Sequence, residues 1–162
     1  MAISLHEASV PVYTLTLNSI ISCLKKGEAL AEAKKFDPGV LLQSRLAPDM
    51  FPLVRQVQIM SDGAKGSTAR LAGVEVPSFP DAEASFTDLY ARINKTIDFM
   101  KTLKPAQFEG AEARDITLKL GPPGTQQTMS WKGAVYLFHF AYPNFFFHAT
   151  TTYNILRHNG VD

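Results

Sequence analysis

The sequence predicts an all-α protein: an antiparallel four-helix bundle with a small accessory β-hairpin, at about residues 114–129, before the last helix. In four long segments, apolar residues recur every three or four positions, as they do along the buried face of a helix. One short stretch instead alternates polar and apolar residues, as a strand does. The 162 residues, 46% of them hydrophobic, suit one core, so we expect a single domain over residues 1–162.

The first two long helices are predicted over about Leu5–Lys26 and about Met50–Leu71. Gly27 is the expected stop of the first helix, and the alanine-rich residues 28–35 are expected to form a separate short helix. Gly73 is the expected stop of the second. Their apolar stripes consist of Val10, Tyr13, Leu17, Ile20, Ile21 and Leu24, and of Met50, Leu53, Val54, Val57, Met60, Ala64 and Leu71.

The third long helix is predicted over about Phe86–Leu103. Ser85 and Asp88 have the spacing of a capping box, in which the side chain of each residue bonds to the backbone of the other. Residues 74–80 precede this helix and contain two prolines, so they predict an extended linker.

The hairpin and the fourth helix follow. Residues 115–120 alternate polar and apolar side chains, residues 121–124 (Gly-Pro-Pro-Gly) predict a turn, and residues 125–129 supply the second strand. The last helix is predicted over Trp131–Arg157. We expect Pro143 to kink or break it, because proline lacks an N–H and its ring clashes with the carbonyl four residues earlier.

Charge and cysteine content exclude several classes of protein. With 16 basic and 15 acidic residues, the chain lacks the bulk positive charge that grips nucleic acid. The single cysteine, Cys23, excludes an internal disulfide framework and a Cys-rich zinc site; it is either a small buried hydrophobe or a nucleophile. The most apolar stretch, residues 134–147, is too short for a membrane span, and no signal-peptide pattern is seen. We expect a cytoplasmic protein without membrane or nucleic-acid partners.

Three of the four histidines lie in the last helical segment. His139, His148 and His158 are nine and ten positions apart, which places them on different helix faces, so a zinc site from this helix alone is not expected. His148 lies at the edge of the inward face, with Asn144 one turn before it and Thr152 one turn after. It is either a core histidine with satisfied nitrogens or part of a binding site.

The same segment is unusually aromatic, with six aromatic residues within ten positions. They either divide between the core and neighbouring elements, or form an exposed patch for homodimer formation, or line a pocket. The six are Phe138, Phe140, Tyr142, Phe145, Phe146 and Phe147. The sequence contains no phosphate-binding loop, Rossmann glycine pattern, Gly-x-Ser-x-Gly elbow or His-Glu-x-x-His motif that would indicate a reaction.

Five motifs are specific in combination: residues 46–51 (LAPDMF), 55–58 (RQVQ), 71–74 (LAGV), 143–148 (PNFFFH) and 155–160 (ILRHNG). Residues 148–161 (HATTTYNILRHNGV) resemble the closing helix of the DinB-like superfamily, and the five motifs together resemble its uncharacterised branch known as domain of unknown function nineteen ninety-three. The resemblance covers essentially the whole chain and implies an up-down-down-up four-helix bundle that is often dimeric.

The resemblance also implies where a metal would bind. Metal-binding members of the superfamily hold nickel or zinc with one histidine from the second helix and two, four residues apart, from the last; some use the metal for thiol-dependent transfer or isomerisation. The closing pair falls on Asn144 and His148, and the second-helix ligand falls near Gln56 or Gln58. Carboxamides are poor ligands for these metals, so we expect no cofactor, with weak nickel or zinc binding left open. The resemblance thus implies a degenerate form of the metal-binding trio at Gln56, Asn144 and His148.

Three hypotheses for function follow. The first is a metal-free bundle whose cavity around His148 binds a small molecule, with His148 as a general acid or base because its ordinary pKa, about 6.5, suits neutral pH. The second is a metal-dependent hydrolase or transferase with a reduced site. The third is a non-catalytic homodimeric interaction module. The ligand-binding residues of the first hypothesis are Gln56, Gln58, Asn144, His148, Tyr142 and Thr152.

Overall fold

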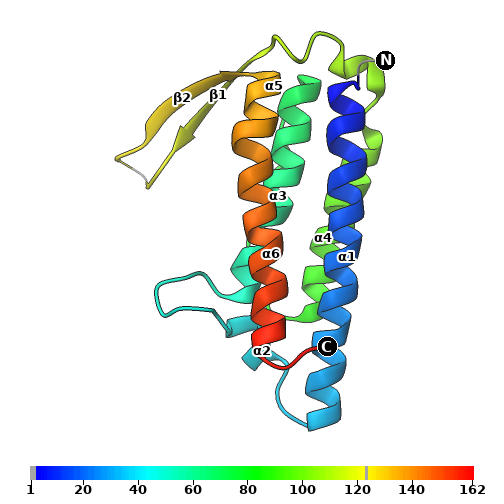
Figure 1. Ribbon diagram of the computed structural model, residues 1–162, viewed down its shortest axis with the longest axis vertical. Coiled ribbons are helices and arrows are strands. Elements are labelled where there is room, and N and C mark those ends of the chain that lie inside the picture. The colour runs from blue at the N-terminus through cyan, green and yellow to red at the C-terminus, as the bar shows by residue number, and fades with distance from the viewer. Residues whose placement is uncertain (1–2, 123) are drawn as a thin grey trace.

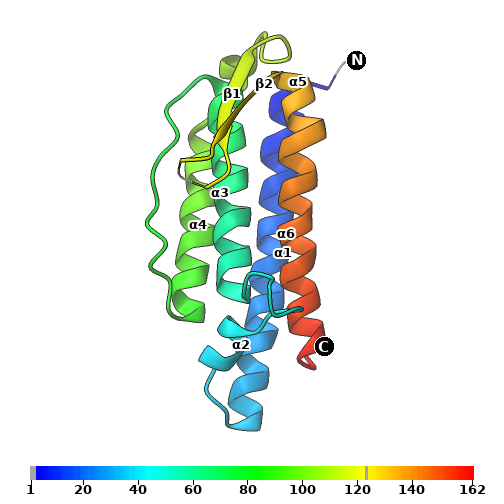
Figure 2. The ribbon, with the colours of Figure 1, turned by 90° about the vertical axis from the view of Figure 1, so that its left-hand side faces the viewer.

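The computed structural model describes residues 3–122 and 124–162, and four long helices pack side by side in it (Figures 1 and 2). Met1, Ala2 and Pro123 of the predicted turn lie outside the described residues. A mostly helical chain with one two-stranded hairpin is confirmed. The long helices are α1 (Leu5–Lys34), α3 (Leu53–Ala72), α4 (Phe86–Thr102) and α6 (Tyr142–His158), and the short ones are α2 (Gly39–Gln43), α5 (Gly133–Tyr136) and the 3-10 turn η1 (Pro105–Phe108).

Successive long helices do not all alternate in direction. In the view of Figure 1 the chain descends along α1, ascends along α3, ascends again along α4 and descends along α6. Residues 73–85, which we call the strap, therefore run back beside α4 (Figure 2). An extended chain advances about 3.3 Å per residue against about 1.5 Å in a helix, so the strap is long enough to span α4.

Helix α1 is continuous over Leu5–Lys34, so the predicted stop at Gly27 and the separate helix over residues 28–35 are wrong. Gly27 is buried, and a Cβ atom placed on it would lie 2.9 Å from Cδ2 of Leu156 in α6. This glycine allows α1 and α6 to approach closely; it does not end the helix. The helix ends instead at Lys35, which adopts a left-handed conformation with φ 56°.

The predicted end of α3 and the predicted start of α4 agree with the structure, whereas α3 begins at Leu53, three residues after the predicted start near Met50. Gly73 closes α3 with φ 69°, as a glycine after a helix commonly does. At the start of α4, the hydroxyl of Ser85 accepts a hydrogen bond from the Asp88 N–H at 3.1 Å. The carboxylate of Asp88 accepts one from the Ser85 N–H at 2.9 Å, which confirms the capping box.

The hairpin projects from one end of the bundle (Figure 1). It pairs β1 (Asp115–Leu120) antiparallel with β2 (Gln127–Lys132), so the second strand continues past the predicted end at residue 129. Trp131 lies in this strand, whereas the sequence places it at the start of the last helix. It is opposite Ile116 in the register and stacks on Phe140 at 4.9 Å between ring centroids, which favours the strand.

The last helical segment passes through a π turn. Helix α5 leads into η2, a π-helical turn over Leu137–Ala141, and then into α6. Pro143 lies in the first turn of α6, directly after η2. Proline has no N–H to donate, and Pro143 lies where the backbone changes from the π-helical to the α-helical hydrogen-bond pattern. The irregularity expected at this proline is therefore a π turn just before it.

The core lies between the four long helices. No helix in the described ranges is both long and apolar enough to cross a bilayer. Cys23 is half-buried and packs against the core. The largest fully buried side chains are Tyr13, Phe86, Phe145, Leu17, Leu24, Leu41, Leu53, Met60, Leu71, Leu89, Ile93 and Met100.

Candidate functional site

His148 of α6 and Gln56 of α3 form a buried hydrogen bond, with His148 Nδ1 2.6 Å from Gln56 Oε1. The amide nitrogen of Gln56 donates to the backbone carbonyl of Phe51 at 3.0 Å, so its oxygen faces the imidazole. A carboxamide oxygen only accepts hydrogen bonds, and Nδ1 must therefore carry the hydrogen. In the neutral ring this leaves the lone pair on Nε2 free.

The surroundings favour the neutral form of His148. The residue is 7% exposed, and this burial lowers its pKa below the ordinary value of 6.5. The positive charge of Arg55 lowers the pKa further. At neutral pH the Nε2 atom of His148 is thus able to accept a hydrogen bond or a proton.

Gln58 and Thr152 take other partners. Gln58 is buried, and its amide donates to the carboxylate of Glu83 at 2.8 Å. Thr152 donates to the backbone carbonyl of His148 at 2.8 Å, within α6 itself. Both hydrogen bonds hold the local structure, and neither side chain joins the His148–Gln56 pair.

Asn144 and Tyr142 also lie apart from the pair in their contacts. Asn144 is exposed on α6. The ring of Tyr142 packs edge-on against Tyr13 at 5.4 Å between centroids. Its hydroxyl is buried without a hydrogen-bond partner among the described residues, and burial raises the pKa of the phenol. The structure therefore brings together two of the six predicted ligand-binding residues, His148 and Gln56, through a side-chain hydrogen bond.

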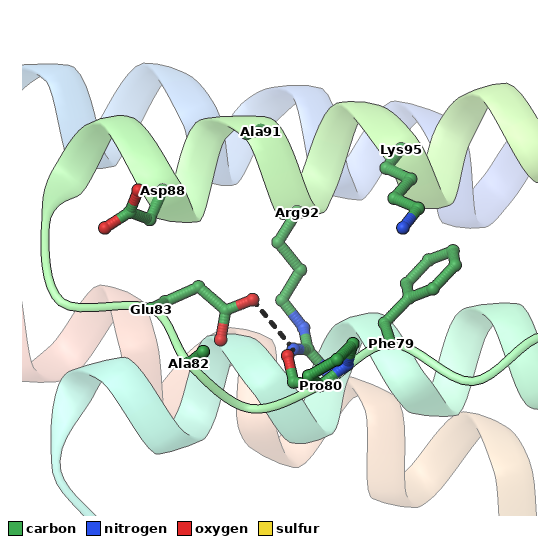
Figure 3. Close-up of a pocket in the computed structure, with 8 residues that line it drawn as sticks. All are labelled: Phe79, Pro80, Ala82, Glu83, Asp88, Ala91, Arg92 and Lys95. Carbon is green, nitrogen blue, oxygen red and sulfur yellow. Dashed lines mark hydrogen bonds and ion pairs between the residues drawn. The ribbon is translucent and has the colours of Figure 1, made fainter.

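A network of charges joins the strap to α3 and α4, and sequence reasoning missed it. The side chain of Arg92 is 1% exposed and binds the carboxylates of Glu83 at 2.9 Å, Asp81 at 3.0 Å and Asp62 at 2.9 Å. Figure 3 shows Arg92 reaching from α4 toward Glu83 on the strap. Asp81 also pairs with Arg55. These ion pairs tie the strap to both helices.

The charges in this network reinforce one another. Burial opposes the charged form of Arg92, but the hydrogen bond to Glu83 and the charge of Asp62 raise the pKa of the guanidinium. Burial likewise raises the pKa of Glu83, and hydrogen bonds from Arg92 and Gln58 outweigh it, so the pKa of Glu83 is lowered. One signal was present in the sequence: Arg92 follows the core residue Leu89 by three positions, and an arginine on a buried face needs acidic partners.

Hollows lie on the α4 side and on the α3 side of the middle of the strap, and His148 lines neither of these two. The first, between the strap and α4, has a volume of about 270 Å³ and is lined by Phe79, Pro80, Ala82, Glu83, Asp88, Ala91, Arg92 and Lys95 (Figure 3). The second, between the strap and α3, has a volume of about 360 Å³ and is lined by Asp62, Lys65, Gly66, Arg70, Val76, Pro77, Ser78 and Phe79.

Comparison with known proteins settles the family. The model of a family described as Domain of unknown function (DUF1993) matches residues 5–162. The chain belongs to the DUF1993 family. The crystal structure of a DinB family member protein from Shewanella denitrificans is 37% identical to this DUF1993 chain, with a TM-score of 0.84 over 98% of this chain and 87% of that one. The comparison with curated proteins gives no match. The resemblance stated from the sequence motifs is confirmed.

The donor set of this DUF1993 protein does not fit the metal-binding trio of the superfamily. His148 supplies one imidazole, Gln56 Oε1 already accepts the hydrogen of that imidazole, and Asn144 is an exposed carboxamide. Carboxamides bind nickel and zinc less well than imidazole does. Within residues 3–122 and 124–162, no group of three or more His, Cys, Asp or Glu side chains lies together in a way that could hold a metal ion.

Proposed function

We propose that this DUF1993 protein binds a small molecule at the His148–Gln56 pair and does so without a metal cofactor. The 2.6 Å hydrogen bond between the two side chains carries the proposal, because it fixes the hydrogen on Nδ1 and leaves Nε2 as an acceptor. The ligand is then a molecule that presents a hydrogen-bond donor, such as an amide or hydroxyl group, to Nε2. If a reaction follows, His148 is the general base.

The proposal includes the finer features of the fold and of the setting. We assign the four long helices to the up-down-down-up arrangement of DinB-like bundles. The common direction of α3 and α4 and the 37% identity to a DinB family member support this assignment. A cytoplasmic location is part of the same proposal and is supported by the single, unpaired cysteine.

Ligand and metal measurements test the proposal. A fragment library is screened by ligand-observed NMR against the wild type, His148→Ala and the control His158→Ala, which changes an exposed residue of the same helix. Binding of the hits is expected to be lost in His148→Ala and kept in His158→Ala. A screen without hits, or hits that bind His148→Ala equally well, would refute ligand binding at this pair.

Metal analysis tests the second half of the proposal on protein made without a histidine tag. Nickel or zinc is expected below about a tenth of an equivalent per chain, even after the metal is added, because the carboxamides are poor ligands. Stoichiometric binding that His148→Ala abolishes would instead support the metal-dependent alternative with a reduced site.

A second role, as a homodimer through η2 and α6, is supported by exposed aromatic side chains. Phe138 is 48% exposed and Phe146 is 39% exposed, and their ring centroids lie 5.8 and 5.4 Å from that of Tyr142 between them. Exposed apolar surface of this kind often marks an interface. Light scattering at micromolar concentration is expected to show a dimer, and Phe138→Ser combined with Phe146→Ser is expected to give a monomer. A monomeric wild type would contradict this role.

A further inference from the structure

Two ammonium groups from different helices lie against one aromatic ring of the strap. Lys65 Nζ of α3 lies 4.0 Å from the ring centroid of Phe79, and Lys95 Nζ of α4 lies 4.2 Å from it. Figure 3 shows the side chain of Lys95 pointing toward the ring of Phe79, and both residues line the first hollow. Cation–π attraction favours each contact, but two like charges that share one ring also repel each other.

The carboxylate that pairs with Lys65 is shared with a second cation. Asp62 is shared between Lys65 at 2.8 Å and Arg92 at 2.9 Å. Lys95 and Arg70 form no ion pair within 4.0 Å among the residues the structure describes. Lys65, Lys95 and Arg70 together therefore carry more positive charge than the shared carboxylate of Asp62 offsets.

The backbone of α3 makes room for one of these cations. A Cβ atom placed on Gly66 would lie 2.5 Å from a terminal nitrogen of Arg70, so the missing side chain is what lets the guanidinium lie across the helix. Gly66, Arg70 and Lys65 all line the 360 Å³ hollow between α3 and the strap. A guanidinium presents paired N–H donors in the geometry that matches carboxylate and phosphate oxygens.

We propose that this hollow binds a small oxyanion, a carboxylate or phosphate group, through Arg70 and Lys65, with Lys95 adding charge from across Phe79. The anion accepts hydrogen bonds from Arg70 and offsets the repulsion between the two lysines. The exposed hydroxyl of Ser78, which also lines the hollow, is a further donor. The site is separate from the His148–Gln56 pair, because His148 does not line this hollow.

A titration followed by two-dimensional amide NMR tests the proposal. Inorganic phosphate and, separately, acetate are added to the full chain at ionic strength held constant with chloride. Saturable shifts are expected at the amides of Gly66, Ser78 and Phe79. Saturation by phosphate alone identifies a phosphate group as the ligand chemistry, and saturation by acetate identifies a carboxylate. Shifts that stay linear or absent with both anions would overturn the proposal.

Variants locate the anion. Arg70→Gln is expected to weaken binding by about tenfold, as the loss of one charge-assisted hydrogen bond implies. Gly66→Ala keeps every charge and is expected to weaken binding as well, because the new methyl group displaces the guanidinium of Arg70. Lys95→Gln is expected to weaken it severalfold. Circular dichroism of each variant shows whether it is folded. If Arg70→Gln does not fold, Gly66→Ala and Lys95→Gln test whether the anion binds in this hollow.

Two controls separate this site from general charge effects and from the other proposal. Lys101→Gln removes an exposed lysine of α4 that pairs with Asp98, and is expected to leave anion binding unchanged. His148→Ala is also expected to leave it unchanged, so failure at one site is distinguishable from failure at the other. If Lys101→Gln weakens binding as much as Lys95→Gln and Gly66→Ala do, the anion is held by net charge alone and the proposal is wrong.

Discussion

Acidification should destabilise this protein through His148 in particular. Burial lowers the pKa of the folded imidazole below 6.5, the ordinary value that the unfolded chain retains. In the pH range between the folded pKa and 6.5, the unfolded chain binds more protons than the folded one. The free energy of unfolding therefore contains a contribution from neutral His148 that is fully present above pH 6.5 and is lost as the pH falls below it.

The size of the effect follows from proton linkage. Within that range, one histidine changes the free energy of unfolding by at most about 1.4 kcal/mol per pH unit. The hydrogen bond to Gln56 does not alter this pH dependence of the free energy of unfolding, because Nδ1 donates to Oε1 in both the neutral and the protonated ring. The loss comes from placing a charge in a buried position that Arg55 already makes positive.

Urea unfolding followed by circular dichroism at about pH 7.5, 6.5 and 5.5 measures the slope. His148→Gln is expected to flatten it, and the control His158→Gln is expected to leave it unchanged. An NMR titration of the His148 ring reports its pKa directly. The reasoning fails if His148 titrates at or above 6.5, or if His148→Gln keeps the wild-type slope.

Three further predictions concern stability. Gly63→Ala in α3, where the new Cβ meets no atom within 4 Å, is expected to raise the free energy of unfolding by about 0.5–1 kcal/mol in urea, and a decrease would contradict the open space around Gly63. Arg92→Met is expected to lower it by about 1.5–3 kcal/mol, because the mostly buried carboxylate of Glu83 loses its cation, while Asp81 keeps Arg55 and Asp62 keeps Lys65; an unchanged midpoint of thermal unfolding would show that the network is dispensable. Ser85→Ala is expected to cost about 1 kcal/mol, measured in urea against an exposed-serine control such as Ser19→Ala, because the cap of α4 is lost.

The features predicted correctly from the sequence depend on residues close together in the chain. The capping box formed by Ser85 and Asp88 lies within one helix turn, and these residue types favour a helix start. The stop at Gly73 is equally local, and glycine there favours a helix end. Gly27 has the residue type of a stop, but its effect depends on Leu156, which is distant in the sequence. A local pattern therefore cannot tell a helix-ending glycine from a glycine of close packing.

The candidate site shows the same division. The family motifs align His148 and a carboxamide of the second helix with metal ligands of the superfamily. In the structure, a hydrogen bond joins His148 to Gln56. Gln58, two positions later, faces the strap and Glu83 instead. The position of Arg92 on a buried helix face indicates that it needs acidic partners, but the strap is an irregular segment without periodicity, so the sequence could not indicate that the strap supplies two of them.

The π turn also determines how the hairpin is attached to the bundle. A π turn contains one residue more than an α turn, and one residue rotates a helix by about 100°. The turn over Leu137–Ala141 therefore sets the angular position of Gly133, at the start of α5, relative to α6. In that position the Gly133 N–H donates to the carbonyl of Arg114 at 2.8 Å, and any Cβ on Gly133 would collide with the carbonyl oxygen of Ala111. The extra residue of the π turn and the missing side chain of Gly133 together fix the orientation of the hairpin relative to α6. Deleting one residue from the turn would therefore misalign the hairpin even though no hairpin residue had changed.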